Sequence, residues 1–525
     1  MSTNPSPALA ALLSFLFPGL GQFYAGDLRK AVLWALPTLL FILGVIWLLL
    51  GGSKAMLDLG FDAQKRVALL VLNIAFFLYH VAAMVDAYSL ARVERYRSFG
   101  GSRGAPIALA ALVALTMVLH GVPEAYGWQI HTGIIKLLPG DSGQVIPSFT
   151  PRPTQPPTIP PSTTPSPFET ATPGTSGSPS PEPTSSGSVG PTATPRACPT
   201  IDLAGWGMAD DGRINLLISG SDSRSDAGAG TSSIRTDSMM LLSIDIASCK
   251  SALFSFPRNM NCDARYPTWF HIALENGQDY PDCLNYLWRS AASNPANFRG
   301  SEGIGPECQA QFDCERGWRA LTGAIQNFAN QRIDGVVAVN LKGFVALVNA
   351  LPGHGVWIDV PYALQDLPGP CPDDPTKTCA YYDSQQQVMR VDFQPGCQFL
   401  NGEEALAFAR SRHQDSDYQR ARRQQIFLQQ VRRQLDPLAL LTNMNDLLAA
   451  AEDNLFMTLA ESDIPNLAQV AARVDADRLY RYDFAPPRLE AVGSMDGMAD
   501  KIRNIFSEPE PEPDNQNQDP CPPRN

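Results

Sequence analysis

Three long apolar segments near the start of the chain restrict its possible folds more than any other feature. They cover residues 31–50, 67–87 and 105–122, and each reaches or approaches the roughly 20 helical residues that cross a bilayer core. Lipid offers no hydrogen bonds to the backbone, so these segments are predicted to be transmembrane helices. A fourth apolar stretch, residues 8–24, is interrupted by Pro and Gly, and we expect a re-entrant, interfacial or broken span there. Residues 1–125 are therefore predicted to form an all-α membrane region.

The interruption reads Pro18-Gly-Leu-Gly-Gln-Phe-Tyr-Ala-Gly26. This sequence resembles a turn of small bacterial membrane hairpin domains. Glycine has no side chain and lets neighbouring membrane helices approach closely. We therefore expect helix packing rather than chemistry from this segment.

Positive charges predict the orientation of the apolar segments. Arg92, Arg95, Arg97 and Arg103 lie between the second and the third segment. Loops rich in arginine stay on the cytoplasmic side, so the third segment is predicted to lead to the outer face of the membrane.

The cysteines agree with this orientation, because all ten lie at or after Cys198. Disulfides form in oxidising compartments outside the membrane. Cys308 with Cys314, and Cys371 with Cys379, are close enough in sequence to bridge short loops. Buried or free thiols are the alternative, and the lack of any Cys-x-x-Cys pair argues against a zinc site.

Two segments have compositions that cannot form a core. Residues 147–197 are rich in Pro, Ser, Thr and Gly, and chains of this kind stay extended. We expect a tether that lifts the following domain away from the lipid. Residues 508–525 contain Glu-Pro repeats and are predicted to form a disordered acidic tail.

Residues 198–490 alternate between strand-like and helix-like apolar patterns, which is typical of an α/β domain with a covered sheet. Strands are predicted at residues 214–218, 239–244, 252–256, 336–339, 356–360 and 479–484. Helices are predicted at residues 318–330, 342–350, 403–409, 420–435, 438–451 and 464–474. Asn401 and Glu404 have the spacing of a reciprocal cap for the third of these helices.

Charged residues gather where the first three predicted strands end or begin. Asp222 and Arg224 follow the first strand, Arg235 and Asp237 precede the second, and Arg258 follows the third. Carboxylate oxygens suit a hard divalent cation, and arginine forks suit phosphate oxygens. Ordinary turn and cap chemistry is the alternative, because Asp is common at strand ends.

A second charged cluster lies far downstream. Arg410 and Arg412 precede a helix in which Arg420, Arg423 and Gln424 occupy positions i, i+3 and i+4. This spacing predicts that the three side chains share one face, and a solvated basic helix is the alternative. If the two clusters meet, they would form a metal-assisted pyrophosphate site.

The overall charge argues against one class of partner. The formal net charge is −12, whereas nucleic-acid affinity rests mainly on a basic surface that neutralises phosphates. We therefore expect no nucleic-acid partner.

The motifs, in their order along the chain, resemble the LytR-CpsA-Psr family of bacterial envelope proteins. The matching pieces span roughly residues 213–435. They are Asn215-Leu-Leu-Ile-Ser-Gly-Ser-Asp222-Ser-Arg224, Arg235-Thr-Asp237-Ser-Met-Met-Leu, Ser255-Phe-Pro-Arg258, Gly343-Phe with Asn349-Ala-Leu, Leu400-Asn-Gly-Glu-Glu-Ala-Leu-Ala-Phe-Ala-Arg410-Ser-Arg412 and Asp417-Tyr-Gln-Arg420-Ala-Arg-Arg423-Gln424.

This resemblance implies an α/β/α sandwich domain outside the membrane that holds a polyprenyl pyrophosphate in an apolar pocket, with Mg²⁺ or Mn²⁺ at the pyrophosphate. It implies a phosphotransferase that moves a glycopolymer from this lipid carrier to peptidoglycan. Asp222 and Asp237 would hold the metal, and Arg235 and Arg258 would complete the catalytic group. The pyrophosphate would be bound by Arg224, Arg258, Arg410, Arg412, Arg420, Arg423 and Gln424.

The chain departs from the family pattern at Asn259, where Asp is usual, and in its several apolar segments, where one span is usual. Two alternatives would use the same site: a polyprenyl pyrophosphate hydrolase with water as acceptor, and a non-catalytic envelope regulator that binds the lipid. The expected location is the bacterial cell membrane, with several spans and the catalytic domain on the outer face. The expected partners are the lipid-linked glycopolymer, peptidoglycan and membrane lipid.

Overall fold

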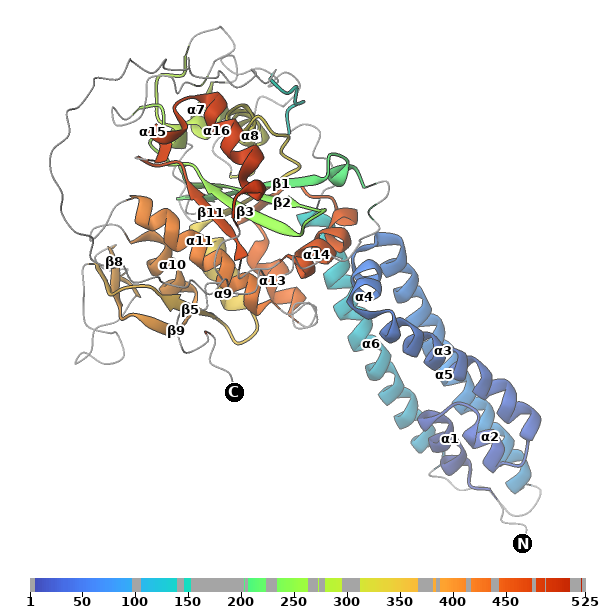
Figure 1. Ribbon diagram of the computed structural model, residues 1–525. Helices are drawn as coiled ribbons and strands as arrows, with labels where there is room; N and C mark the ends of the chain where they lie inside the picture. Colours follow the sequence, from blue (N-terminus) through green and yellow to red (C-terminus); the bar gives the residue numbers. More distant parts are fainter. Residues whose placement is uncertain are drawn as a thin grey trace, which may run out of the picture.

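The computed structural model describes residues 5–96, 105–138, 146–152, 203, 206–222, 234–262, 272, 279–294, 312–366, 381–383, 388–411, 417–435, 443–474, 478–486, 488–509 and 521. Its N-terminal part is an elongated bundle of helices, and its C-terminal part is an α/β domain at one end of that bundle (Figure 1).

The bundle contains three helices that are long and apolar enough to cross a membrane: α3 (Leu28–Leu50), α5 (Ala63–Tyr96) and α6 (Ala105–Leu137). They coincide with the three predicted segments. A short helix, α4 (Gly52–Phe61), joins α3 to α5. α6 continues far beyond residue 122, because the polar residues that follow interrupt the apolar run without ending the helix.

The interrupted stretch at residues 8–24 is broken into α1 (Pro7–Leu16) and α2 (Leu20–Tyr24). Gly19 between them has a φ of +106°, and a Cβ there would lie 2.5 Å from the backbone O of Ala31. Only glycine therefore fits at this crossing. The expected role of this segment in close helix packing is confirmed.

The domain is built on a six-stranded mixed sheet with the order β10-β4-β1-β2-β3-β11. Its strands are β1 (Arg213–Ser221), β2 (Thr236–Asp245), β3 (Lys250–Ser255), β4 (Gly335–Asn340), β10 (Leu455–Met457) and β11 (Tyr480–Asp483). β1 pairs antiparallel with β2 and parallel with β4. Five of these strands match predicted ones, and β10 is too short to produce a recognisable pattern.

Helices cover both faces of the sheet, so the predicted α/β/α sandwich is confirmed (Figure 1). The layer on one face comprises α7 (Leu287–Ser293), α8 (Glu315–Ala329), α15 (Arg488–Val492) and α16 (Met495–Asn504). The other layer comprises α9 (Leu341–Ala350), α10 (Gly402–Arg410), α11 (Asp417–Gln434) and α13 (Met444–Ala451). Neighbouring strand residues point to opposite faces, so Leu217 joins the core with Trp288 and Trp318, while Ile218 faces the second layer.

A smaller lobe extends the second layer. β5 (Val356–Val360) pairs with β9 (Gly396–Leu400), and β6 (Leu364–Asp366), β8 (Val388–Phe393) and β7 (Tyr381–Asp383) form a three-stranded sheet. Their apolar residues pack with those of α10 and α11. The sequence predicts only β5 among these strands, because the others are short or carry polar residues.

Two described disulfides join Cys262 to Cys283 and Cys397 to Cys521. Neither is one of the predicted close pairs. Both predicted pairs include cysteines that lie outside the described residues, namely Cys308, Cys371 and Cys379. Cys314 is itself disulfide-bonded. Because Cys397 belongs to β9, the predicted disordered tail is covalently fixed near its end.

The domain packs directly on the end of the helix bundle. Ile134 and Leu138 of α6 are buried in a cluster with Leu459. Phe61 of α4 and Leu467 of α14 (Ile464–Arg473) pack against this cluster. This contact differs from the expected separation by a tether. Apolar residues in the last turns of α6 account for it, because they need a surface that buries them.

The first residues of the predicted tether also lie on the domain. The backbone O of Pro147 accepts a hydrogen bond from Gln326 Nε2 (3.1 Å), and the backbone N–H of Arg152 donates to Asn330 Oδ1 (2.8 Å). The chain therefore runs along α8 here, and residues 153–197 lie outside the described part.

Candidate active site

β1 and β2 bring the first predicted cluster together. Asp222 follows β1, and its Oδ1 accepts a hydrogen bond from the backbone N–H of Arg235 (2.7 Å). A bulge between Gly220 and Ser221 shifts the register at this end of the pair. Bulges re-aim side chains next to sites, and here both Asp222 and Asp237 line one cavity.

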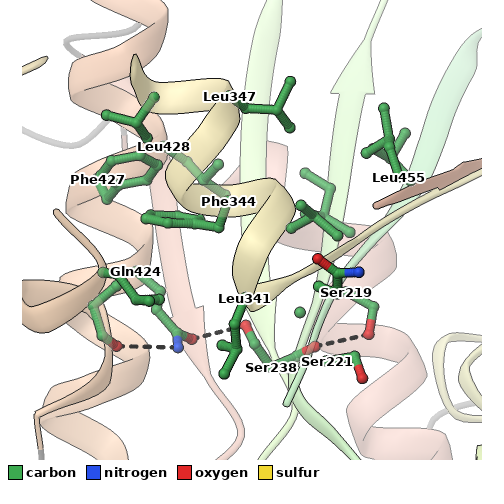
Figure 2. A pocket seen from close by; sticks show the side chains of 18 of the residues that line it. Ser219, Ser221, Ser238, Leu341, Phe344, Leu347, Gln424, Phe427, Leu428 and Leu455 are labelled. Carbon is green, nitrogen blue, oxygen red and sulfur yellow. Dashed lines mark hydrogen bonds between the residues drawn. The ribbon is translucent and has the colours of Figure 1, made fainter. Parts of the chain in front are cut away.

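α11 brings the second cluster to the same corner. Arg420 donates from Nη2 to the backbone O of Asp237 (3.2 Å). Ser238 Oγ donates to Gln424 Oε1 (2.8 Å), a contact visible in Figure 2. These pairs are 183 and 186 residues apart in the sequence. The two charged clusters therefore meet, as their chemistry predicted.

Asp237 accepts two side-chain hydrogen bonds within the site. Its Oδ1 accepts hydrogen bonds from Arg258 Nη1 (2.9 Å) and Asn285 Nδ2 (3.3 Å). Burial by itself would raise the pKa of Asp237, but the charge and hydrogen bond of Arg258, the charge of Arg420 and the Asn285 bond together lower it. Asp237 is therefore ionised at neutral pH.

Asp222 experiences a different balance. Burial raises its pKa, and the neighbouring charge of Asp237 adds to this effect. The hydrogen bond from the Arg235 backbone and the charges of Arg235 and Arg410 act in the opposite direction without overcoming it. Two adjacent carboxylates with pKa values displaced in opposite directions are typical of functional sites.

Arg235 lies at the rim of the site. Its Nε is 3.7 Å from Asp222 Oδ2, and its guanidinium carbon lies 5.5 Å from the ring centroid of Tyr286. The side chain is 43% exposed. It lies beside Asp222 on the solvent side, and its place in the catalytic group stays a prediction.

Arg410 reaches the cavity from the last turn of α10. The predicted reciprocal cap at the other end of this helix is present, with Glu404 N–H donating to Asn401 Oδ1 (3.0 Å) and Asn401 N–H to Glu404 Oε2 (2.9 Å). The cap and the buried apolar side of α10 fix the position of this helix, and with it the position of Arg410 in the last turn. The charge of Arg410 acts on Asp222.

Arg423 occupies a different place from the one predicted. Its guanidinium is buried and donates to the backbone O of Phe408 (2.9 Å), to Tyr362 Oη (2.7 Å) and to the backbone O of Ser411. It lines neither the cavity nor the adjoining pocket that contains Arg420. The predicted shared face holds for Arg420 and Gln424 only.

The three side chains span about 100° around the helix axis, and Arg423 and Gln424 lie at the two ends of this arc. α10 packs against α11, and Arg423 lies on the side that faces α10, where the backbone oxygens of Phe408 and Ser411 accept its hydrogen bonds. Arg420 and Gln424 lie on the side that faces the sheet. Arg224 and Arg412 lie outside the described residues, so their roles stay predictions.

The cavity beside this corner has a volume of about 320 Å³. Its polar wall contains Asp222, Asp237, Ser238, Arg410 and Gln424. The remaining wall is largely apolar and comes from β1, β2, β4, α9, α10, α11, α13 and β10. Figure 2 shows Ser238 and Ser221 at one end of the view, and Leu347 and Leu455 at the other.

Sequence reasoning missed three kinds of site residue. Asn285 contacts Asp237 from a segment without regular periodicity, and Ser238 contacts Gln424 from β2. Apolar residues such as Phe344 and Leu347 of α9 line the cavity, but in the sequence they are indistinguishable from core residues. The available signal for Asn285 was a polar residue next to Tyr286 in an apolar run, which is weak.

The two carboxylates fit a hard divalent cation. Asp237 accepts two side-chain hydrogen bonds through Oδ1, and among the described residues none is donated to its Oδ2. In the described chain, no group of three His, Cys, Asp or Glu forms a complete protein cage. Mg²⁺ is commonly bound by one or two carboxylates with substrate phosphates and water, which is the donor set that Asp222 and Asp237 offer.

Comparison with known proteins gives the following matches. The profile described as the LytR_cpsA_psr family matches residues 192–484. An uncharacterized protein of Staphylococcus aureus is 31% identical over 158 residues, which cover 30% of this chain and 35% of that protein. The polyisoprenyl-teichoic acid–peptidoglycan teichoic acid transferase TagU of Enterococcus faecalis is 27% identical over 146 residues, covering 27% of this chain and 40% of that protein.

The chain thus spans well under half of the length of these two curated relatives. Among solved structures, TagV of B. subtilis is 17% identical, with a TM-score of 0.35, and the match covers 57% of this chain and 98% of that one.

Proposed function

Because the chain belongs to the LytR_cpsA_psr family, whose profile matches more than half of its length, we propose that it is a membrane-anchored phosphotransferase. Its donor is a glycopolymer on a polyprenyl pyrophosphate carrier, and its acceptor is peptidoglycan. The Enterococcus faecalis relative is named as a transferase of teichoic acid from a polyisoprenyl-linked donor to peptidoglycan. This similarity supports a reaction of the same class here.

The observation that carries this proposal is the convergence of charged side chains beside an apolar cavity. Arg258 and Arg420 contact Asp237 there, and Asp222 and Arg410 line the same wall. A ligand that suits both parts needs an anionic head and an apolar tail. A polyprenyl pyrophosphate has this construction, with oxygens for the arginines and hydrocarbon for the leucines.

The chain's own residues would act mainly by positioning and electrostatics. Arg258 and Arg420 are held by Asp237 before any substrate arrives, so their charges need no reorganisation during the reaction. Gln424, held by Ser238, fixes the polar wall between them. When bound by Asp222 and Asp237, Mg²⁺ or Mn²⁺ would supply further neutralisation of phosphate charge.

The proposed step exchanges one phosphorus–oxygen bond for another. An acceptor hydroxyl of peptidoglycan attacks the phosphorus attached to the glycopolymer. The bond from this phosphorus to the bridging oxygen breaks, and polyprenyl monophosphate leaves with the bond electrons. The acceptor's proton goes to solvent or a carboxylate, so atoms and charge balance.

The membrane location rests on α3, α5 and α6, which have the length and composition of membrane spans. The disulfides Cys262–Cys283 and Cys397–Cys521 favour an oxidising compartment for the domain. We therefore propose that several spans anchor the protein and that its catalytic domain lies on the outer face.

The test uses the full chain in lipid vesicles with a radiolabelled polyprenyl pyrophosphate-linked glycopolymer, Mg²⁺ and peptidoglycan fragments. We expect label on the peptidoglycan and polyprenyl monophosphate as the second product. Release of soluble glycopolymer phosphate alone would instead identify a hydrolase. Binding of the donor without turnover would identify a regulator and contradict the transferase.

A further inference from the structure

One helix separates the apolar cavity from the membrane bundle. α13 contributes Leu447 to the cavity wall, while the next residue, Leu448, lies against Gly133 of α6. A Cβ at Gly133 would be 2.8 Å from Leu448 Cδ1, so glycine is what permits this close contact. Neighbouring residues of α13 therefore contact the cavity and the membrane helix.

The neighbouring edge strand has the same double role. Leu455 of β10 lines the cavity, and Met457, two residues later, packs into the cluster around Ile134 of α6. Val337 of β4 pairs with Met457, lines the cavity and contacts the same cluster. An apolar surface thus continues from α6 to the part of the cavity remote from its charged wall.

Polar contacts hold this junction in place. Arg66 at the start of α5 is only 6% exposed and forms an ion pair with Glu461 of the domain. Its Nε also donates to His131 Nδ1 of α6 (3.3 Å). Around the rim, Asn445 Nδ2 donates to Gln129 Oε1 (3.2 Å). A buried ion pair needs fixed partners, so it resists sliding of the domain on the bundle.

The length of α6 leaves room for such a junction. Its 33 residues extend about 50 Å at 1.5 Å per residue, whereas a hydrocarbon core is about 30 Å thick. About four turns therefore project from the lipid. Trp128 and Tyr126, which suit a membrane interface, lie just before the turns that contain Gly133 and Ile134.

We propose that the α6–α13 junction is the route by which the polyprenyl chain of a membrane-resident donor passes between the bilayer and the cavity. This inference rests on the proposed function and adds where its lipid substrate enters. Every methylene exposed to water is unfavourable, so a long prenyl chain needs an apolar path. The residues of the junction are positioning residues and do not touch the reacting atoms.

The test compares two donors in the full chain reconstituted in phosphatidylglycerol vesicles. One donor carries a long polyprenyl chain and resides in the vesicle, and the other carries a geranyl chain and dissolves in water. Gly133→Phe forces Leu448 away from α6. We expect it to reduce turnover of the vesicle-borne donor about tenfold or more, through loss of effective concentration, and to leave the soluble donor within about twofold.

Gly121→Phe is the matched control, because no atom lies within 4 Å of a Cβ at this position of the same helix. It should leave both donors unchanged. An equal loss for both donors in Gly133→Phe, or no loss for either, would overturn the proposed route. Failure of the unsubstituted protein to use either donor would instead contradict the proposed function.

A covalent lock provides a measurement that does not depend on misfolding of a variant. Gln129→Cys with Asn445→Cys replaces two side chains already in contact, and oxidation should join α6 to α13. We expect the locked protein to retain turnover of the vesicle-borne donor. Selective loss of this donor on locking, restored by reduction of the added pair, would mean that the domain must leave the bundle, and would contradict the route.

A photoreactive prenyl phosphate in the same vesicles tests the route without any reaction. Its tail should label α13 in the unsubstituted protein and label it less in Gly133→Phe. Labelling confined to the lipid-facing surface of α3 and α5 would contradict the inference even if turnover were never observed.

Discussion

Two aspartates in different parts of the molecule have nearly the same exposure but different surroundings. Asp86 of α5 is 25% exposed and Asp237 of β2 is 24% exposed. Asp86 uses both oxygens: Lys30 Nζ binds Oδ1 (2.7 Å), and Trp34 Nε1 (3.0 Å) and Gln22 Nε2 (3.3 Å) donate to Oδ2. Asp237 concentrates its two described side-chain hydrogen bonds on Oδ1.

Under the proposed function, the difference separates a structural carboxylate from a metal-binding one. Asp86 ties α2 and α3 to α5, and its hydrogen-bonding capacity serves packing of helices. Asp237 accepts both of its described side-chain hydrogen bonds through Oδ1, and the residue lines the cavity. The exposed fraction therefore does not distinguish the two aspartates, whereas the distribution of hydrogen bonds over their oxygens does.

The largest effect is expected for Asp237→Asn. Asparagine can still accept the Arg258 hydrogen bond through its oxygen, so the fold should persist, but the charge and the second oxygen are lost. We expect glycopolymer transfer to fall by about a hundredfold or more. The measurement is the transfer rate in vesicles at saturating Mg²⁺, alongside the circular dichroism spectrum.

Chelation sharpens this prediction. A chelator should reduce transfer by the unsubstituted protein to about the level of the variant and should have little further effect on the variant. Full activity in chelator would rule out a metal at Asp222 and Asp237.

A large effect on stability, rather than on binding, is expected for Arg423→Ala. Removing this buried side chain removes the hydrogen bonds that it donates to the backbone oxygens of Phe408 and Ser411 and to the hydroxyl of Tyr362. We expect a loss of about 3 kcal/mol in the free energy of unfolding. Denaturant unfolding of the detergent-solubilised chain measures it, and an unchanged midpoint would return Arg423 to the list of ligand-binding candidates.

A smaller effect is expected for Arg420→Ala. Loss of a charged donor next to the proposed pyrophosphate position should weaken donor binding by about 2 kcal/mol, or roughly thirtyfold. Arg422→Ala is the matched control, because Arg422 is exposed on the same helix and should leave affinity unchanged. Similar losses in both variants would show that the helix acts only through its net charge.

The smallest effect is expected for Asp86→Asn. The substitution removes the negative charge that Lys30 contacts and replaces one acceptor oxygen with an amide nitrogen. We expect the free energy of unfolding of the helix bundle to fall by about 1 kcal/mol, measured by thermal unfolding. Transfer of the vesicle-borne donor should stay within about twofold. A loss of transfer as large as that in Asp237→Asn would remove the distinction between the two aspartates.

Local patterns predicted most of the elements. The three apolar segments correspond to α3, α5 and α6, and the predicted strands at residues 214–218 and 239–244 lie within β1 and β2. The strand predicted at residues 252–256 overlaps β3 except at its last residue. The Asn401–Glu404 cap was predictable because both partners are three residues apart. Such features depend on neighbours in the sequence, so the sequence displays them directly.

Features that depend on distant partners were less accessible. The position of Arg423 depends on where α10 packs, and the contact of α6 with the domain depends on Leu448 and Leu459, more than 300 residues later. The tail was predicted to be disordered from composition, yet its Cys521 is attached to Cys397. Composition describes the tendency of a segment and contains no information about such a long-range bond.

By itself the sequence determined the kinds of element, their order and the charged residues that make an anion and metal site conceivable, because hydrophobic period and chemical type are local properties. Only the tertiary structure decided which arginines face the aspartates, which face supporting carbonyls, and where an apolar cavity meets both. These outcomes depend on how α10, α11 and α13 pack against one sheet, and the packing couples residues whose separation along the chain carries no information about their distance in space.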